Sequence, residues 1–217
     1  QVKSRDMFVD AKKLLQEEKY GLAQGLFYQV YNDEFTLQSQ KEEALFYIAI
    51  CSKRLFNEDA IFWLENFAST YPYSPKISTV NYEMGLYYYE KKLYDKTIDY
   101  LLSCGHSSDE YTFKLAYSYF MIDSLSSSKY YFSKLLNGGS KYASSSRYFY
   151  AHIAYKQKHY KTALSTFLTL KDDEHFANIV PYYVSQIYFL LRKYDELIAY
   201  AEPMLDKVIS SREAELN

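Results

Sequence analysis

Residues that could carry acid–base, metal or nucleophilic chemistry are few in this sequence, and they are poorly grouped. No two histidines stand four residues apart, the spacing that would place two imidazoles on one metal ion along a helix; they are His106, His152, His159 and His175. The carboxylate pairs Glu17-Glu18 and Asp172-Asp173 fall in expected connectors, where solvation is commoner than catalysis. There is no glycine-rich phosphate loop and no glycine-flanked nucleophilic serine. The sequence therefore predicts a non-enzymatic protein without a metal or cofactor.

Aromatic residues are the one chemically distinctive group, with 27 Tyr and 14 Phe in 217 residues. A tyrosine combines a large apolar ring with a hydroxyl group that tolerates water. Two interpretations follow. Either the rings pack short helices together, or some of them line a binding groove.

Charge and cysteine content narrow the choice of partners. A net charge of −2 disfavours a nucleic-acid partner, which needs a basic face. Cys51 and Cys104 are expected to be free, buried thiols, because two cysteines in a chain of this length do not form a disulfide framework. No run reaches the ~20 apolar residues of a membrane helix. No signal peptide is visible, although a chain that begins at Gln1 is compatible with removal of one.

The elements that position these residues are best seen in the segment Asn81–Leu101. Tyr82, Gly85 and Tyr89 recur at helical spacing, Lys91-Lys92-Leu93 forms a polar break, and a second helical period starts at Tyr94. Glycine inside a helix costs about 1 kcal/mol relative to alanine, so Gly85 predicts a close approach by the partner helix. The segment is therefore expected to form a helical hairpin.

The same spacing recurs along the chain at intervals close to the ~34 residues of helix-turn-helix repeats. A small residue in the first helix gives the column Ala11, Ile48, Gly85, Ala116, Ala151 and Ser185. The turn aromatic gives Tyr20, Phe56, Tyr94, Leu125, Tyr160 and Tyr194. A small residue in the second helix gives Ala23, Ala60, Thr97, Ser128, Ala163 and Leu197, and the large residue four positions later gives Phe27, Leu64, Leu101, Phe132, Phe167 and Ala201.

These columns resemble the tetratricopeptide repeat (TPR) family, most closely in YEMGLYYYEKKLYDKTIDYL (82–101) and YAHIAYKQKHYKTALSTFLTL (150–170). The usual first-helix Trp is absent, and the closing Pro is clear only at Pro72. The resemblance covers residues 5–205. It implies an all-α, TPR-type α–α superhelix, a right-handed solenoid of about six repeats, that acts as a scaffold for a protein or peptide partner.

We predict a single solenoid domain over 1–217, because no shift in composition divides the chain. The expected repeats are 5–37, 41–75, 78–108, 109–140, 144–175 and 178–208. Residues 209–217 are expected to begin a further helix. A solenoid normally ends in a polar cap, and none is evident, so we expect the natural chain to continue past Asn217.

Residues 66–101 resemble a narrower group, the repeats of bacterial cell-envelope proteins such as the barrel-assembly lipoprotein and the periplasmic protein that coordinates with the Tol system. The residues that carry this resemblance are Phe67, Tyr71, Pro72, Ser74 and Pro75. It implies a periplasmic or envelope location, with the cytoplasm as the alternative, and no activity.

In solenoids of this kind the first helices line the concave face, which is the usual binding surface. Helical spacing from the small residues places there Tyr82, Tyr89, Phe113, Tyr117, Phe120, Tyr148, His152, Tyr155, Tyr182, Gln186 and Phe189. The corresponding positions of the first two repeats are less aromatic, with Phe8, Lys12, Leu45 and Ala49. These rings either bind a partner or pack against each other. A carboxylate tail would find almost no cation among them.

Three functions remain open. The chain is an envelope scaffold that binds a partner through the aromatic groove, or a carbohydrate-binding module that stacks sugars on Tyr and Phe, or the N-terminal scaffold segment of a longer regulatory protein. The oligomeric state is not predicted.

Overall fold

The computed structural model describes residues 2–204, with side chains from residue 5 onward, and within this range it is helical with no strand. The chain divides into two compact units, residues 1–107 and residues 108–217. That the two form one solenoid domain stays a prediction, and the further helix expected over 209–217 lies outside the described residues.

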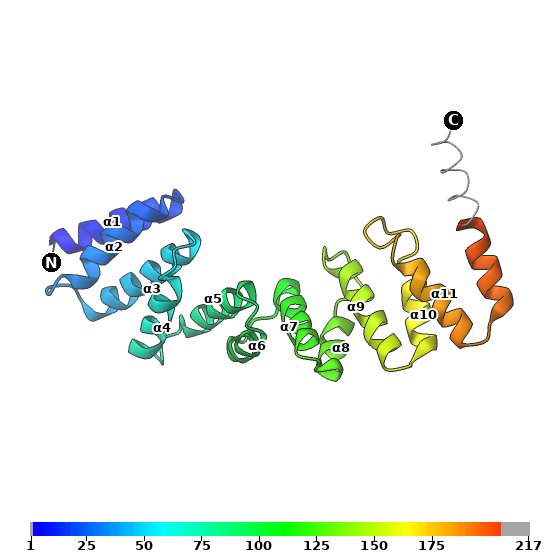
Figure 1. The fold of residues 1–217 in the computed structure, drawn as a ribbon. Coiled ribbons are helices and arrows are strands. Elements are labelled where there is room, and N and C mark those ends of the chain that lie inside the picture. The colour runs from blue at the N-terminus through cyan, green and yellow to red at the C-terminus, as the bar shows by residue number, and fades with distance from the viewer. Residues whose placement is uncertain (1, 205–217) are drawn as a thin grey trace, which may run out of the picture. The chain divides into compact units, whose positions relative to one another are not determined.

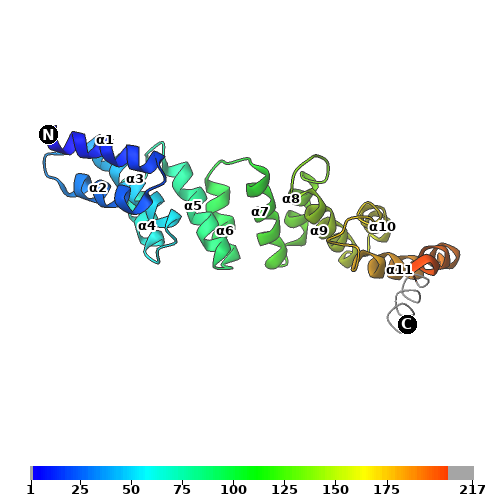
Figure 2. The same cartoon turned by 90° about the horizontal axis from the view of Figure 1, so that it is seen from above.

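The first unit consists of three antiparallel helical hairpins, each packed beside the next (Figures 1 and 2). Its helices are α1 (Val2–Gln16), α2 (Tyr20–Asn32), α3 (Gln38–Arg54), α4 (Ala60–Thr70), α5 (Ile77–Glu90) and α6 (Tyr94–Ser103).

The second unit repeats this arrangement. Its helices are α7 (Asp109–Met121), α8 (Leu125–Ser133), α9 (Ala143–Lys156), α10 (Tyr160–Leu168) and α11 (Val180–Leu190), and residues 194–204 are also helical. In both units the first helix of each later hairpin packs against the second helix of the hairpin before it. This packing brings rings from successive first helices together.

The repeated columns form the hydrophobic core of the hairpins. The large second-helix residues are fully buried in five hairpins, at Phe27, Leu64, Leu101, Phe132 and Phe167. The small residues opposite them are also buried, including Ala11, Ala23, Ala116, Ala151 and Ala163. A small residue lets two helices approach closely, and a large one fills the space next to that contact.

Gly85 is a direct case of this close approach, as the sequence predicted. A Cβ atom added to Gly85 would lie 2.6 Å from Leu101 Cδ2 and 2.9 Å from Leu101 Cγ. Leu101 is itself fully buried, so it has little room to move away. Glycine is therefore required at this crossing of α5 and α6.

Each hairpin turn contains one non-glycine residue in the left-handed region, with φ between +56° and +60°; these are Glu18, Phe56, Lys92, Asp123, Lys158 and Arg192. The N–H of the next residue donates to a carbonyl five positions back, for example His159 N to Ala154 O at 2.8 Å and Lys193 N to Tyr188 O at 2.9 Å. This is the Schellman ending of a helix, which satisfies carbonyls that the helix leaves unpaired. It leads the chain straight into the second helix of the hairpin.

The second hairpin differs from the sequence expectation. We aligned Phe56 with the turn aromatics such as Tyr160, but it occupies the left-handed turn position and is 83% exposed. The cause is a shorter turn: the buried Ala60 follows Phe56 by four residues, whereas Ala163 follows Lys158 by five.

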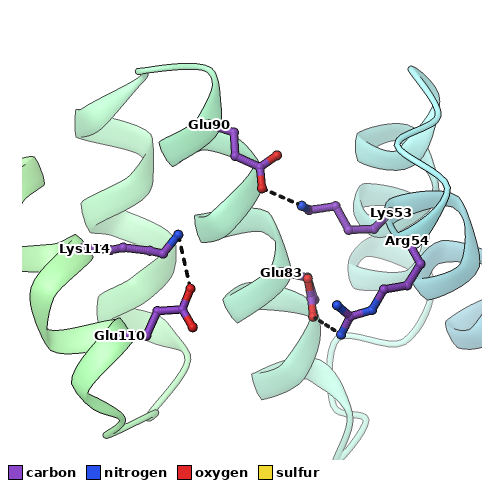
Figure 3. A network of polar contacts seen from close by, with 6 residues as sticks. All are labelled: Lys53, Arg54, Glu83, Glu90, Glu110 and Lys114. Atoms are coloured by element: carbon purple, nitrogen blue, oxygen red, sulfur yellow. Dashed lines mark hydrogen bonds and ion pairs between the residues drawn. The ribbon is translucent and has the colours of Figure 1, made fainter. Parts of the chain in front are cut away.

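Two ion pairs connect the second and third hairpins of the first unit (Figure 3). At the end of α3, Lys53 Nζ lies 2.9 Å from Glu90 Oε1, and Arg54 Nη2 lies 3.8 Å from Glu83 Oε1. Both carboxylates belong to α5, so the two pairs tie α3 to α5. Cys51 and Cys104 are free and buried in this unit, as predicted.

Candidate functional site

The aromatic residues predicted for the groove are arranged in repeated cups, which are clearest in the second unit. In α7, Phe113, Tyr117 and Phe120 surround one ring from the next hairpin, Phe149 of α9. The ring centroids lie 6.4, 5.4 and 5.1 Å from that of Phe149. Phe149 also stacks on Phe132 of α8, at 5.2 Å and 10°. A cup is thus three first-helix residues at i, i+4 and i+7 together with the large residue of the second helix.

The next hairpin repeats this geometry 35 residues later. Tyr148, His152 and Tyr155 of α9 surround Tyr183 of α11, with centroid distances of 6.4, 5.5 and 5.4 Å. Tyr183 stacks on Phe167 at 4.9 Å and 6°. Six of the predicted groove residues are therefore half-buried walls of cups that the chain itself fills.

A less aromatic cup occurs in the first unit. Tyr47 of α3 stacks on Phe27 at 4.9 Å and 25°, and Lys12 Nζ lies 5.9 Å from the Tyr47 ring centroid. Phe8 contacts Phe27 edge-on at 5.9 Å. Leu45 and Ala49, the other two positions compared in the sequence, are fully buried in the core.

The predicted groove residues of α5 have local partners within the first unit. Tyr82 stacks on His106 at 4.4 Å and 19°, and Tyr89 meets Tyr94 edge-on at 6.2 Å. Both tyrosines are half-buried.

The last described hairpin carries a third cup of the second unit, and this cup is open. Tyr182, Gln186 and Phe189 follow Tyr148, His152 and Tyr155 by 34 residues. The described ring contacts of Tyr182 and Phe189 are edge-on and within their own hairpin, with Tyr183 at 5.6 Å and with Tyr194 at 6.0 Å. Tyr182 is 60% exposed and Phe189 is 61% exposed. The second-helix position that holds Phe167 in the preceding hairpin is here Ala201. We call Tyr182, Gln186, Phe189 and Ala201 the open cup.

A hollow of about 400 Å³ lies beside the open cup, and no charged side chain lines it. Its lining residues are Tyr155, Ser185, Gln186, Phe189, Leu190 and Leu197. The Tyr155 hydroxyl donates a 2.7 Å hydrogen bond to Gln186 Oε1, which fixes the amide against the wall. Burial raises the pKa of Tyr155, so its hydroxyl keeps the proton that it donates. The surface suits an apolar or aromatic group better than a charged one.

Two side chains of the second filled cup have shifted pKa values. Burial, together with Tyr148, raises the pKa of Tyr183 to about 12. Burial also lowers the pKa of His152, with a smaller contribution from Lys156, and His152 Nδ1 is buried without a hydrogen-bond partner among the described residues. A neutral imidazole is therefore favoured inside the second cup.

The rings that fill the cups were not predicted from the sequence. Phe149 and Tyr183 each stand two residues before a small residue of the repeat, Ala151 and Ser185. The rings that cover the cup rims were also missed. Tyr142 stacks on Phe113 at 4.9 Å, and Phe176 stacks on Tyr148 at 4.9 Å. Their common offset in the repeat was the signal that could have found them.

In the part of the chain that the structure describes, no three His, Cys, Asp or Glu side chains gather as they would around a metal ion. Among the helices of residues 2–204, none combines the length and the apolar character needed to cross a membrane.

Comparison with solved structures settles the fold. MamA of AMB-1 superposes with a TM-score of 0.64 at 16% identity, over 80% of this chain and 93% of that chain. A tetratricopeptide repeat protein from Parabacteroides merdae superposes with a TM-score of 0.61 at 13% identity, over 95% of this chain and 80% of that chain. YrrB, described as a TPR protein with an unusual peptide-binding site, superposes with a TM-score of 0.61 at 17% identity, over 80% of this chain and 88% of that chain.

The fold is that of the tetratricopeptide repeat proteins. The all-α expectation of TPR-type helical hairpins is thereby confirmed. At these identities the likeness concerns the fold alone. No protein-family model and no curated protein sequence matches the chain.

Proposed function

We propose that this chain is a non-enzymatic scaffold that binds a segment of a partner protein at the open cup. The fold supports this, because helical-repeat proteins present extended surfaces to partners. The observation that carries the proposal is that the third cup has the spacing of the two filled ones while its rings are exposed. Exposed rings grouped on an uncharged surface are typical of interaction sites.

The open cup is favoured over the wider predicted groove. The rings of Phe113, Tyr117, Phe120, Tyr148 and Tyr155 already contact a ring of the following hairpin, so a partner would gain little new apolar burial from them. Tyr182 and Phe189 have most of their surface still to bury. Burial of apolar area at about 25 cal/mol per Å² makes such rings the natural anchors of an interface.

The test is photo-crosslinking in the native host. A photoreactive phenylalanine analogue in place of Tyr182 should give one discrete protein adduct, and the same analogue in place of Tyr130 should not. Tyr130 is the matched control because it is an exposed tyrosine of the same unit, on α8. Partner capture should be lost in a Tyr182→Ala/Phe189→Ala variant with unchanged helical content. Equal adducts at both positions would disprove a binding role for the open cup.

Carbohydrate binding through the same rings is less well supported. Trp63, the side chain best suited to sugar stacking, donates a 2.9 Å hydrogen bond to Asp59 Oδ2 and packs edge-on against Tyr28 and Phe62. A glycan that quenched Tyr or Trp fluorescence in the wild type, but not in Tyr182→Ala/Phe189→Ala, would favour this alternative.

We also propose a bacterial envelope location, on the resemblance of residues 66–101 alone. In the structure, Ser74 of this segment accepts a 3.1 Å hydrogen bond from Lys76 N and donates one to Glu42 of α3. These hydrogen bonds hold the segment in the fold, and they would form in any cellular compartment. Fractionation of the native host with a periplasmic marker tests the location, and recovery with cytoplasmic markers would refute it.

A further inference from the structure

We propose that the turn between α9 and α10 binds an acidic segment of a partner protein, whose carboxylate groups pair with the lysines of this turn. This is a second binding surface of the chain, separate from the open cup, and it does not depend on binding there. The observation that carries the proposal is a concentration of positive charge at one of six similar hairpin turns.

Positive charge is concentrated in the middle of the second unit. Residues 124–171 contain eight Lys or Arg residues and no Asp or Glu, although acidic residues outnumber basic ones in the whole chain, 27 to 25. The stretch covers α8, α9 and α10. Its cations can therefore be neutralised only by residues outside the stretch, by solvent ions or by a partner.

The turn between α9 and α10 differs in charge from the other hairpin turns. The window from two residues before its left-handed residue to four residues after it is 156–162, and it contains three lysines and no carboxylate. In the first and last hairpins a carboxylate of the same window pairs with a lysine, at 2.8 Å for Lys19 and 2.6 Å for Lys193. Each of the five other windows contains at least one carboxylate; these are Glu17, Glu18, Glu58, Asp59, Glu90, Asp95, Asp123, Asp195 and Glu196.

The lysines of this turn border a hollow of about 400 Å³ whose lining contains no acidic side chain. Lys158 and Lys161 both line the hollow, are exposed, and form no ion pair with the described residues. Lys156 Nζ lies 3.5 Å from Asp123 Oδ1. Lys129 of α8 brings a fourth ammonium group to the turn, 3.3 Å from the side-chain oxygen of Gln157. We call Lys129, Lys156, Lys158 and Lys161 the basic turn.

Protein carboxylates fit the basic turn better than a nucleic acid does. Single-stranded nucleic acid stacks its bases on free ring faces. Here Lys129 Nζ lies 5.2 Å from the Tyr150 ring centroid and Lys134 Nζ lies 4.4 Å from that of Tyr130, so lysines already cover a face of these rings. The one arginine of the stretch, Arg147, donates a 2.9 Å hydrogen bond to a backbone carbonyl. The basic turn therefore offers point charges and no bidentate contact to a phosphate.

The hollow also has an apolar side. Its lining includes the ring of Tyr160, at the start of α10, and Leu191, which follows α11. A ligand made only of carboxylates would leave these two side chains unused. We expect the acidic segment to carry an aliphatic residue next to its carboxylates, which would lose its contact with water against this side.

The test titrates the full 217-residue chain into a fluorescein-labelled peptide that repeats Glu-Asp-Leu four times. The peptide should bind with a measurable Kd, and the Kd should rise about tenfold or more between 50 and 300 mM NaCl, because salt screens exposed charge pairs. Lys158→Glu/Lys161→Glu should raise the Kd about tenfold or more at 50 mM NaCl, because like charges would then face each other. Lys158→Arg/Lys161→Arg keeps the charge and should leave the Kd unchanged. No measurable binding by the wild type, or binding that does not depend on salt, would overturn the proposal.

The matched control is Lys91→Glu/Lys92→Glu, in the turn between α5 and α6. Both lysines are exposed and the change in net charge is the same, but the Kd should stay at the wild-type value. Glutamate is compatible with this turn geometry, since Glu18 has φ +56° at the corresponding position of the first hairpin. Helical content should therefore be unchanged in every variant. An equal rise of the Kd in both glutamate variants would attribute binding to net charge alone and would overturn the proposal.

The same proteins distinguish other occupants of the basic turn. Tighter binding of the wild type to a 20-nucleotide oligo-dT, or to vesicles of phosphatidylglycerol and phosphatidylcholine, than to the peptide would overturn the assignment to an acidic protein segment. A dimer of the purified chain that Lys158→Glu/Lys161→Glu abolishes in analytical ultracentrifugation would assign the turn to a second copy and would also overturn it.

One further variant separates this inference from the proposed function. Tyr182→Ala/Phe189→Ala should bind the acidic peptide as the wild type does, because the open cup lies outside the basic turn. Loss of peptide binding in this variant would place the peptide at the open cup and overturn the inference. Failure of the peptide to bind any of the proteins would leave the open-cup proposal standing.

Discussion

Single residues in this protein are constrained mainly by how closely two helices approach each other. Gly85 and His152 show two forms of that constraint. Position 85 must be glycine because the crossing leaves no space for a Cβ atom. His152 is fixed by what surrounds its ring, since it lies among aromatic rings that offer Nδ1 no partner.

Gly85→Ala should lower the free energy of unfolding by about 1–3 kcal/mol, because the new Cβ would overlap the side chain of buried Leu101. The matched control is Gly25→Ala in α2, where an added Cβ meets nothing within 4 Å. That change should raise the stability by about 0.5–1 kcal/mol through helix propensity. Urea unfolding of both variants measures the difference. Equal effects would mean that Gly85 is not at a tight crossing.

Stability should depend on the protonation of His152. Its pKa is lowered in the folded chain, chiefly by burial, so the unfolded chain takes up the proton first as the pH falls. Stability should therefore be complete above about pH 6.5 and should decline below it until the folded-state pKa is reached. The neighbouring groups that also face this ring are Tyr148, Tyr183 and Lys156.

The measurement is the denaturant midpoint between pH 7.5 and pH 5. His152→Gln should flatten its decline, whereas His159→Gln, in an exposed turn, should not. An unchanged slope in His152→Gln would assign the effect to other groups.

The helices and turns show how far sequence reasoning reaches. The buried columns were predictable, because a core position must be small or large in every repeat and therefore recurs with the period. The rings that fill the cups were missed, because helical spacing alone does not distinguish a ring that enters the next hairpin from one that faces water. Only their shared offset from the small residue of the repeat marks them. Phe149 and Tyr183 are of this kind.

Element ends were less predictable than element centres. The cap of α7 is Ser108, whose side chain accepts a 3.1 Å hydrogen bond from Tyr111 N, a contact that no repeated column marks. The helix α8 ends at Ser133, five residues before the glycine pair at 138–139. Phe56 was misplaced by a turn one residue shorter than the others. Ends depend on single hydrogen bonds and on loop length, which leave little periodic trace.

Replacing a left-handed turn residue with glycine should stabilise the protein. Lys158→Gly should raise the free energy of unfolding by about 1 kcal/mol, because a residue with a Cβ atom is strained at φ +60°. Ser165→Gly in the middle of α10 is the control and should lower it, since glycine weakens helix interiors. Thermal unfolding of the two variants should move in opposite directions.

At the scale of the molecule, the described helices contact each other within a hairpin or between adjacent hairpins, so damage should stay local. Tyr183→Ala removes the ring from the second cup and should cost about 3 kcal/mol within the second unit. Hydrogen exchange should accelerate in α9, α10 and α11 and remain unchanged in α1 to α4.

Cys51 provides an independent reporter of the first unit. Burial raises its pKa to about 11, so it reacts with thiol reagents only when the unit opens. Its labelling rate should be the same in Tyr183→Ala and in the wild type. A faster rate would show that the two units open together.

The step of 34 or 35 residues between cups also bears on how such a gene can change length. A tandem duplication of one 34-residue stretch in the second unit would preserve the contact of each ring with its cup. The inserted hairpin would supply a ring to the preceding cup, and its own cup would accept the ring of the following hairpin. An insertion or deletion whose length is not a multiple of this step would break the contact between a ring and its cup. Growth and shrinkage in whole hairpins are therefore the mutations that this architecture tolerates best.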